Sequence, residues 1–599
     1  MYFRSCFNNI RFLFVMKYFF ITLTCFVFFI SGLFGQQEPY LSNQTYTYDG
    51  AIQQYKLLAS TYPQWCAYQE FGMSDYGLPV SLFLMSKGGK FYPREYAVKP
   101  VFLINNAIHP GEPEGVDASV KLAKDMLTDT SLLPENIIIA IIPIYNIGGA
   151  MNRNCCSRAN QNGPAEYGFR GNAKNLDLNR DFVKTDSKNT YAFYSIFHAL
   201  KPAVFIDTHT SNGADYQYTM TLITSQLNKM NPVLAEFVKN EMNPVLYDSM
   251  SAKGFPMVPY VTTFGDTPDE GIIDFLETPR YSTGYTNLFN CISYVAETHM
   301  LKPFDQRVIA TYDLLLTISE FMDAHAKELM ELKTKANDEL ARTETFALDW
   351  ELDTTVFDMI DFRGYTADYK KSEVTGTNRL YYDHERPYTK KIKYFNSYRP
   401  VKIVQRPEYY IIPQQWDVVI EKMKKSNVKI YRLNQDINLQ AEYYDIIHYE
   451  TVNGPYEGHY LHHAVEVLKD TTTAGFRKGD YVIPTRNEMV RFIVETLEPH
   501  AVDSYLAWNY FDAILQQKEW FSAYVFEDEA PQVLAENPEL KKAFEEKKKN
   551  DPSFAASSFA QLYFIYKGSS HYEPSHNQYP VVRIMQTINS SYLEEDLSR

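Results

Sequence analysis

Three short apolar runs in the first half of the chain each end in polar side chains, and this feature constrains the fold more than any other. Residues 101–106 begin Val-Phe-Leu-Ile and lead into the loop His109-Pro-Gly-Glu112. Residues 203–209 read Ala-Val-Phe-Ile-Asp-Thr-His, and residues 292–297 read Ile-Ser-Tyr-Val-Ala-Glu. Such runs are typical of buried strands, and ligands of open α/β sheets gather at the carboxyl ends of strands. The chain is therefore predicted to form an α/β domain with a polar site at one edge of its sheet.

The segment after the first run has the pattern of an amphipathic helix. Between residues 116 and 126 the apolar side chains recur on one face, and Asp117, Lys121 and Lys124 are expected on the more exposed side. The loop that carries His109 therefore lies where a strand ends and a helix begins.

His109, Glu112 and His209 form a donor set suited to a divalent metal. A catalytic zinc takes three protein ligands of the His and Glu type and leaves a fourth position for water, whose pKa it lowers towards neutrality. Residues 177–182, Asp-Leu-Asn-Arg-Asp-Phe, add a guanidinium that can hold an anion through two parallel hydrogen bonds. The sequence predicts a zinc hydrolase that holds one zinc ion.

In order and spacing these segments resemble the carboxypeptidase A-like family of zinc metallocarboxypeptidases over residues 45–325. His-x-x-Glu followed roughly a hundred residues later by His is the family's zinc signature, here His109, Glu112 and His209. Asp-Leu-Asn-Arg lies between these ligand segments, and a strand ending in Glu297 follows them. The resemblance implies a mixed, mostly parallel sheet flanked by helices.

The resemblance also implies the roles of residues that act on the peptide bond. Glu297 resembles the general base, which accepts a proton from the attacking water and delivers it to the leaving amine. Arg170, in Phe-Arg-Gly-Asn, best matches the arginine that polarises the scissile carbonyl. Arg153 and Arg158 remain alternatives for that role.

A second set of residues is implied to bind the substrate. Asn179 and Arg180 match the pair that holds the terminal carboxylate, which points to exopeptidase action on peptides. Tyr281 resembles the mobile tyrosine that closes over the substrate, and Tyr285 is the alternative. If Tyr281 is the counterpart, Leu288 seven residues later predicts an apolar side-chain pocket.

Two other functions use parts of the same pattern. N-acyl amino-acid deacylases of the aspartoacylase and succinylglutamate desuccinylase type also have His-x-x-Glu and Asp-Leu-Asn-Arg, but they are mostly intracellular. An inactive module that binds carboxylates is the other alternative, and the presence of Glu297 argues against it.

Residues 1–35 have the pattern of a secretory signal peptide. Lys17 precedes the apolar run 18–30, and Gly35 supplies a small residue before the predicted mature start; Met16 is an alternative initiator. This pattern predicts a secreted or periplasmic protein with no stable membrane span after cleavage. The chain has 73 acidic and 58 basic residues, a net charge of −15, which disfavours nucleic acid as a partner.

Four cysteines remain after residue 35, too few for a disulfide framework in so long a chain. Cys155 and Cys156 are adjacent and are not expected to bond to each other. A bond from Cys291 to one of them is left open.

At 599 residues the chain is expected to hold more than one domain. Residues 40–335 are predicted to form the catalytic domain, closed by helices within residues 307–335. Residues 336–599 are predicted as a β-rich or α+β accessory region, with strands followed by helices. Strands are expected at residues 409–413, 428–431 and 481–484, with a helix at 416–424. His459 and His463 have a spacing that would place both on one helical face, although packing or surface histidines are the favoured interpretation.

Overall fold

The computed structural model describes residues 37–597. The predicted signal peptide, residues 1–35, lies outside the described residues. Among the helices of the described part, none is long and apolar enough to cross a membrane.

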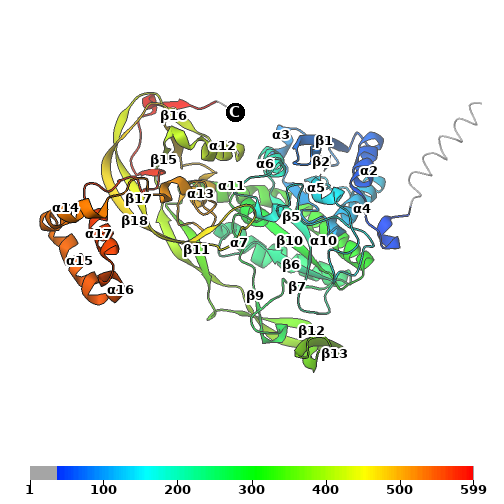
Figure 1. Ribbon diagram of the computed structural model, residues 1–599. Helices are drawn as coiled ribbons and strands as arrows, with labels where there is room; N and C mark the ends of the chain where they lie inside the picture. Colours follow the sequence, from blue (N-terminus) through cyan, green and yellow to red (C-terminus); the bar gives the residue numbers. More distant parts are fainter. Residues whose placement is uncertain (1–36, 598–599) are drawn as a thin grey trace, which may run out of the picture.

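A mixed eight-stranded sheet forms the centre of the N-terminal half (Figure 1). Its order is β1-β2-β4-β3-β5-β10-β6-β7, and its four central strands β4, β3, β5 and β10 run parallel. The strands predicted from the three apolar runs are β3, β5 and β10, which lie side by side, so their carboxyl ends share one edge. The α/β class with a mixed, mostly parallel sheet is confirmed. The strands are β1 (Cys66–Met73), β2 (Pro79–Met85), β3 (Val101–Asn105), β4 (Ile138–Ile142), β5 (Val204–Ser211), β6 (Met220–Thr224), β7 (Met257–Pro259) and β10 (Ile292–His299).

Helices cover both faces of this sheet because alternate side chains of each buried strand point to opposite faces. In β3, Val101 and Leu103 pack on the face covered by α6, whereas Phe102 and Ile104 pack on the face covered by α4 and α10. The helices of this half are α2 (Tyr48–Thr61), α3 (Pro93–Tyr96), α4 (Glu114–Thr128), α5 (Ile147–Met151), α6 (Lys188–Leu200), α7 (Pro232–Phe237), α8 (Asn243–Ala252), α9 (Ser282–Asn287), α10 (Phe304–Ala324) and α11 (Ala326–Arg342).

The predicted helix at residues 116–126 is confirmed as part of α4, with one correction. Asp117 was expected to be exposed, but it is fully buried, and its carboxylate accepts a hydrogen bond from the Thr45 hydroxyl. The preceding chain covers this side of α4, and burial raises the pKa of Asp117 well above its ordinary value. The spacing of apolar side chains along α4 did not indicate that the helix is covered on two sides.

Three further sheets contain the strands of the second half, and one of them also includes two short strands of the first half, β8 and β9. A seven-stranded sheet has the order β18-β17-β20-β15-β19-β16-β21, a two-stranded sheet pairs β11 with β14, and a four-stranded sheet has the order β12-β13-β9-β8. The strands of these three sheets are β8 (Thr262–Thr263), β9 (Ile272–Ile273), β11 (Thr345–Leu352), β12 (Asp358–Lys371), β13 (Asn378–Phe395), β14 (Tyr398–Gln405), β15 (Tyr409–Ile412), β16 (Tyr431–Leu433), β17 (Ile437–Thr451), β18 (His462–Phe476), β19 (Tyr481–Pro484), β20 (Val582–Ile584) and β21 (Leu593–Glu595).

Two long hairpins in this half, β12–β13 and β17–β18, were not predicted. Many of their side chains are exposed on both faces, so they lack the apolar alternation that marks a half-buried strand. The predicted strands at 409–413 and 481–484 correspond to β15 and β19. The strand predicted at 428–431 was misplaced, because β16 begins only at Tyr431.

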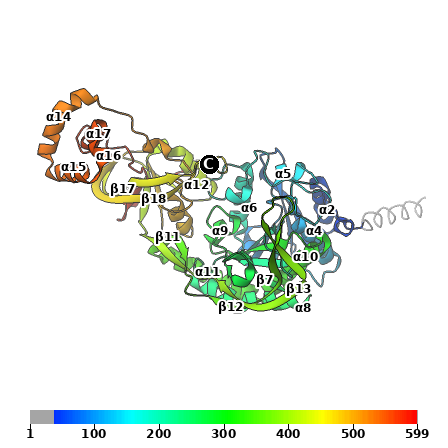
Figure 2. The ribbon, with the colours of Figure 1, turned by 60° about the horizontal axis from the view of Figure 1, so that its bottom comes forward.

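The helices of the second half are interspersed with its strands, since α12 precedes β16 and the strands β20 and β21 follow α17, and α14 to α17 form a separate group. Figures 1 and 2 both show this group on the opposite side of the molecule from α2. The hairpin β12–β13 projects from the N-terminal half in Figure 1. The helices are α12 (Asp417–Lys425), α13 (Val490–Leu497), α14 (Ala523–Glu536), α15 (Pro538–Asn550), α16 (Pro552–Ala555) and α17 (Ser558–Lys567).

The two halves share one apolar core. The ring of Tyr285 in α9 lies 5.9 Å from the ring of Phe492 in α13, and both belong to a buried cluster that extends from the first sheet to β15. Asp186, just before α6, accepts hydrogen bonds from Tyr510 and Lys422 of the second half and pairs with His459 at 2.7 Å. These contacts hold the accessory region against the carboxyl edge of the sheet.

Candidate active site

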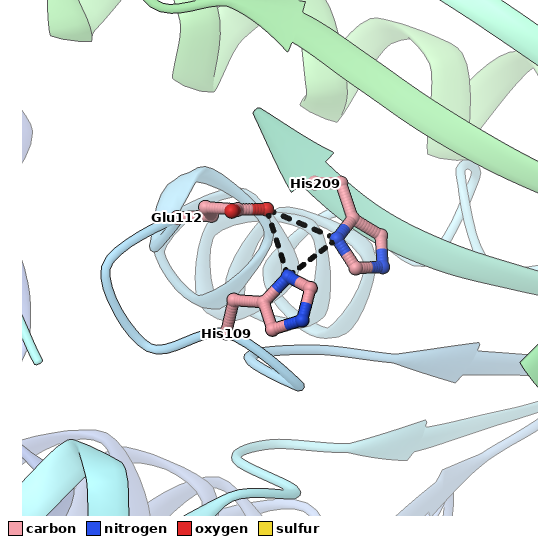
Figure 3. Close-up of side chains that lie close together, drawn as sticks. All are labelled: His109, Glu112 and His209. Atoms are coloured by element: carbon pink, nitrogen blue, oxygen red, sulfur yellow. Dashed lines mark hydrogen bonds and ion pairs between the residues drawn. The ribbon is translucent and has the colours of Figure 1, made fainter. Parts of the chain in front are cut away.

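Three predicted metal ligands converge at the carboxyl ends of β3 and β5. His109 and Glu112 lie in the loop between β3 and α4, and His209 lies in β5 (Figure 3). The Nδ1 atoms of the two histidines are 3.1 Å apart, and Oε2 of Glu112 lies 3.0 Å from the Nδ1 of His209 and 3.3 Å from that of His109. All three side chains are buried, and in the described part of the chain they form the group able to hold a metal ion.

This geometry fits zinc. Zinc–ligand bonds of about 2.1 Å in tetrahedral geometry place neighbouring ligand atoms roughly 3.4 Å apart. The three observed separations, 3.0 to 3.3 Å, are close to that value. The donors are two imidazoles and a carboxylate, a set typical of catalytic zinc sites that keep a fourth position open.

Two further carboxylates fix the orientation of the imidazoles. Oδ1 of Asp177 lies 2.9 Å from Nε2 of His109, and Oδ2 of Asp207 lies 3.1 Å from Nε2 of His209. A proton held on each Nε2 leaves each Nδ1 unprotonated towards the metal position, as ligand histidines require. The motif Asp-Leu-Asn-Arg does not by itself indicate this role for Asp177, because the contact with His109 joins residues 68 positions apart.

The local charges shift the pKa values of the carboxylates in opposite directions. Burial by itself would raise the pKa of Asp177, but His109 and the nearby arginines hold it well below its ordinary range. Burial opposes ionisation of Glu112 too, and Arg158 and His109 lower its pKa well below the ordinary value. Burial, reinforced by Glu112, raises the pKa of Glu297 to about 8 against the opposing effect of His209.

Glu297 lies on β10 directly beside His209 on β5, because the two residues are register partners in parallel strands. Both side chains line a cavity of about 530 Å³. The strand predicted at 292–297 thus brings Glu297 next to the metal ligands.

The three candidate arginines separate into different positions. Arg153 donates to the carbonyl oxygen of Glu166 at 2.9 Å and does not line the cavity. Arg158 donates to Oε1 of Glu112 at 2.7 Å and to the carbonyl oxygen of Thr210 at 3.1 Å. Arg170 donates from Nε to Asp177 at 3.0 Å, and its Nη1 lies 3.5 Å from Glu112. Both Arg158 and Arg170 line the cavity, and the Arg158 side chain is 15% exposed whereas that of Arg170 is 46% exposed.

Asn179 and Arg180 lie in the short helical turn after Asp177 and both line the cavity. Oδ1 of Asn179 accepts a hydrogen bond from the backbone N–H of Ser282 at 2.9 Å. The guanidinium of Arg180 lies 4.3 Å from the centre of the Tyr281 ring, and Tyr281 lines the cavity as well. Tyr285 instead is fully buried and stacks on Tyr194 at 4.6 Å, so the alternative assignment of Tyr285 was wrong.

The wall of the cavity also contains uncharged side chains that the sequence did not indicate. Leu288 was a candidate for the pocket, but it lies in the core and not among the lining residues, because α9 turns its side chain away. Tyr260 and Phe275 line the cavity from irregular segments, where no periodic pattern marks them. Ile223, Thr283, Val295 and Met300 are among the other apolar or hydroxyl-bearing residues of the wall.

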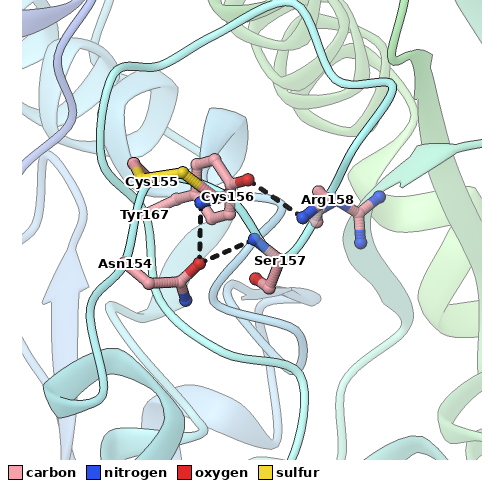
Figure 4. The surroundings of a disulfide bond; sticks show 6 residues. All are labelled: Asn154, Cys155, Cys156, Ser157, Arg158 and Tyr167. Atoms are coloured by element: carbon pink, nitrogen blue, oxygen red, sulfur yellow. Dashed lines mark hydrogen bonds between the residues drawn. A yellow bond between two sulfur atoms is a disulfide. The ribbon is translucent and has the colours of Figure 1, made fainter.

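Cys155 and Cys156 form a disulfide, contrary to the expectation that adjacent cysteines remain unbonded (Figure 4). A tight turn brings the two sulfur atoms together, because Oδ1 of Asn154 accepts hydrogen bonds from the N–H groups of Cys156 and Ser157. Cys291, just before β10, is free and buried, so the bond from Cys291 that the sequence left open is not formed. The residues after the disulfide, 157–160, line the cavity.

His459 and His463 do not share a helical face, because His459 lies in a turn and His463 in β18. His459 pairs with Asp186, and His462 lies 3.0 Å from Asp512. His463 is exposed. These histidines pack between segments or face solvent.

Comparisons with known proteins point to one class of enzyme. Residues 52–219 match a family model described as "Zinc carboxypeptidase". Carboxypeptidase 2 of Trichophyton rubrum is 20% identical over 487 residues, which cover 74% of this chain and 80% of that protein. A metallo-carboxypeptidase from Burkholderia cenocepacia has 16% identity and a TM-score of 0.35, over 47% of this chain and 70% of that one. Carboxypeptidase A from Helicoverpa armigera has 14% identity and a TM-score of 0.34, over 49% of this chain and 74% of that one.

Proposed function

We propose that the protein is a secreted exopeptidase that removes the C-terminal residue of peptides, starting from the match of residues 52–219 to the zinc carboxypeptidase family model. One observation carries the proposal. The zinc donor set, Glu297 and the Asn179–Arg180 pair all line the same cavity.

The metal-binding residues would be His109, Glu112 and His209. Bound there, zinc supplies a Lewis acid that polarises a carbonyl and lowers the pKa of water. Asp177 and Asp207 keep the two imidazoles oriented, so the donor atoms need little rearrangement to bind the ion.

Glu297 is the proposed general base. It accepts the proton of the water that attacks the scissile carbonyl and then gives that proton to the nitrogen of the leaving amino acid. Its position beside His209 supports this role, because the carboxylate reaches the cavity at the level of the metal ligands. Arg170 donates to the carbonyl oxygen as negative charge develops on it. Both arginines already pair with carboxylates, Arg158 with Glu112 and Arg170 with Asp177, and Arg158 is the weaker candidate because its side chain is the less exposed of the two.

Asn179 and Arg180 bind the terminal carboxylate of the substrate in this proposal, and Tyr281 closes over it. A guanidinium and a carboxylate form a charge-assisted, bidentate pair, which selects substrates with a free C-terminus. Ile223, Thr283 and Val295 line the cavity without a charge, which favours an uncharged C-terminal side chain.

Export belongs to the same proposal. Lys17 followed by an apolar run and a small residue at Gly35 supports cleavage before Gln36. The preferred substrates are therefore peptides met outside the cytoplasm.

The test uses purified protein beginning at Gln36 and a peptide library with free C-termini, beside the same library with C-terminal amides. We expect release of single C-terminal residues from the free peptides only, loss of release with chelator and recovery with zinc. Glu297→Gln retains zinc but loses at least about a hundredfold in kcat, the usual contribution of a general base. Hydrolysis of N-acylaspartate with none of the peptides would replace the proposal by the deacylase function, and zinc binding without any hydrolysis would leave only a carboxylate-binding module.

A further inference from the structure

A turn from the accessory region reaches the proposed carboxylate site. It lies between β17 and β18, where the backbone N–H of Tyr456 donates to the carbonyl of His459 at 2.7 Å and the reverse bond is 3.0 Å. The two residues between them, Glu457 and Gly458, have φ angles of 50° and 85°. Two consecutive positive φ angles make a two-residue hairpin turn, which holds the flanking side chains in defined directions.

Tyr456 contacts the arginine that is proposed to bind the substrate. Nε of Arg180 donates a hydrogen bond to the Tyr456 hydroxyl at 3.1 Å. The Tyr456 ring stacks on Trp508, with ring centres 6.1 Å apart, and the guanidinium of Arg280 lies 5.7 Å from the same ring. Arg280 in turn pairs with Asp503 at 2.7 Å. The Tyr456 ring therefore lies against Trp508 of the accessory region and Arg280 of the catalytic domain, and Arg280 is itself held by Asp503 of the accessory region.

The neighbouring residues of the turn hold the segment that carries Arg180. Oε2 of Glu457 accepts a hydrogen bond from the backbone N–H of Asp177 at 2.6 Å. His459 pairs with Asp186 at 2.7 Å, so the turn holds the segment 177–186 at both of its ends.

We infer that Tyr456 is a positioning residue of the carboxylate site, an inference that rests on the proposed function. A guanidinium has five N–H donors. The Tyr456 hydroxyl takes the Nε donor, and the Asn179 carbonyl takes one Nη1 donor at 2.8 Å. The remaining donors are at the end of the guanidinium, so a substrate carboxylate pairs with Nη1 and Nη2 end-on. The accessory region thus fixes the angle at which Arg180 presents itself to the substrate.

The inference is tested with Tyr456→Phe in the full chain with zinc bound. Phenylalanine keeps the ring on Trp508 and removes only the oxygen that accepts from Arg180. The matched control is Tyr460→Phe, because Tyr460 lies on the same segment and its side chain is 53% exposed. We expect Tyr456→Phe to raise KM for free peptides about five- to tenfold, with kcat within about twofold, since it weakens carboxylate binding in ground and transition states alike.

Binding measured without turnover separates this inference from the proposed function. Calorimetry measures the affinity for one peptide and for its C-terminal amide in three proteins: Glu297→Gln alone, Glu297→Gln with Tyr456→Phe, and Glu297→Gln with Tyr460→Phe. The inference is supported if Tyr456→Phe weakens binding of the free peptide but not of the amide, and Tyr460→Phe weakens neither. This holds even if no variant hydrolyses peptides. Equal affinities for the two variants, or no preference of the Glu297→Gln protein for the free peptide over the amide, would overturn it.

Discussion

Replacement of Asp177 by asparagine tests how the zinc donors are oriented. Oδ1 of Asp177 lies 2.9 Å from Nε2 of His109 and accepts a hydrogen bond from the backbone N–H of Asn179, and Oδ2 lies 3.0 Å from Nε of Arg170. Asparagine keeps one acceptor oxygen and turns an NH₂ group towards the other donor. One charge-assisted hydrogen bond is therefore lost, and such a bond contributes about 1.5 to 3 kcal/mol.

That energy converts into a measurable loss of zinc affinity. If the lost bond is the one to His109, its free energy corresponds to a roughly 10- to 100-fold weaker zinc affinity, the range found when partners of ligand histidines are removed. If asparagine keeps its oxygen towards His109, the loss falls on Arg170 and appears in kcat instead. For Asp177→Asn, the fold-loss of zinc affinity multiplied by the fold-loss of kcat is expected to be about 10- to 100-fold.

The assay is competition for zinc with a chromophoric chelator, combined with steady-state kinetics at saturating zinc. The control is Asp125→Asn, because Asp125 lies on α4 close to the site in sequence but pairs with Lys121 on its surface. Asp177→Asn with zinc affinity and kcat both within twofold of the unchanged protein would refute the orientation argument.

Three further predictions concern the contact between the two halves of the chain, the pocket and the two arginines. Asp186→Asn is expected to lower the free energy of unfolding by about 2 to 4 kcal/mol at pH 7, because Lys422 and His459 lose a partly buried partner. Burial opposes ionisation of Asp186, but His459 and the lysines lower its pKa below the ordinary value, so its contribution is present above pH 4 and is lost as the pH falls. The prediction would be contradicted if the urea midpoints of Asp186→Asn and the unchanged protein differed by the same amount at pH 7 and at pH 3. Ile223→Ala should raise kcat/KM for peptides ending in large aromatic residues about tenfold relative to those ending in leucine, and an unchanged ratio would place the side-chain pocket elsewhere. Arg170→Gln should lower kcat about a hundredfold with zinc retained. A larger loss of kcat in Arg158→Gln than in Arg170→Gln would exchange the proposed roles of the two arginines.

Local patterns predicted the parts of the site that lie at strand ends. The apolar runs at 101–106, 203–209 and 292–297 became β3, β5 and β10, and each carries its polar residues at its carboxyl end or in the loop that follows. Such runs can be recognised because burial on both faces requires continuous apolar side chains. The hairpins β12–β13 and β17–β18 could not be recognised this way, since their side chains are largely exposed.

The disulfide and the pocket wall show a second limit of sequence reasoning. Whether Cys155 bonds to Cys156 depends on a turn held by Asn154, and whether Leu288 reaches the pocket depends on the orientation of α9. Both are properties of backbone conformation that residue spacing does not determine.

By itself the sequence predicted the proposed zinc donors, base and carboxylate-binding pair, because each lies in a short motif whose chemistry can be inferred from neighbouring residues. Only the tertiary structure decided that Tyr456 meets Arg180 across 276 residues and Glu457 meets Asp177 across 280. No local pattern encodes such contacts, because they arise when the shared core between the two halves brings distant segments together. The accessory region, which carried no motif of its own, thereby becomes part of the proposed active site.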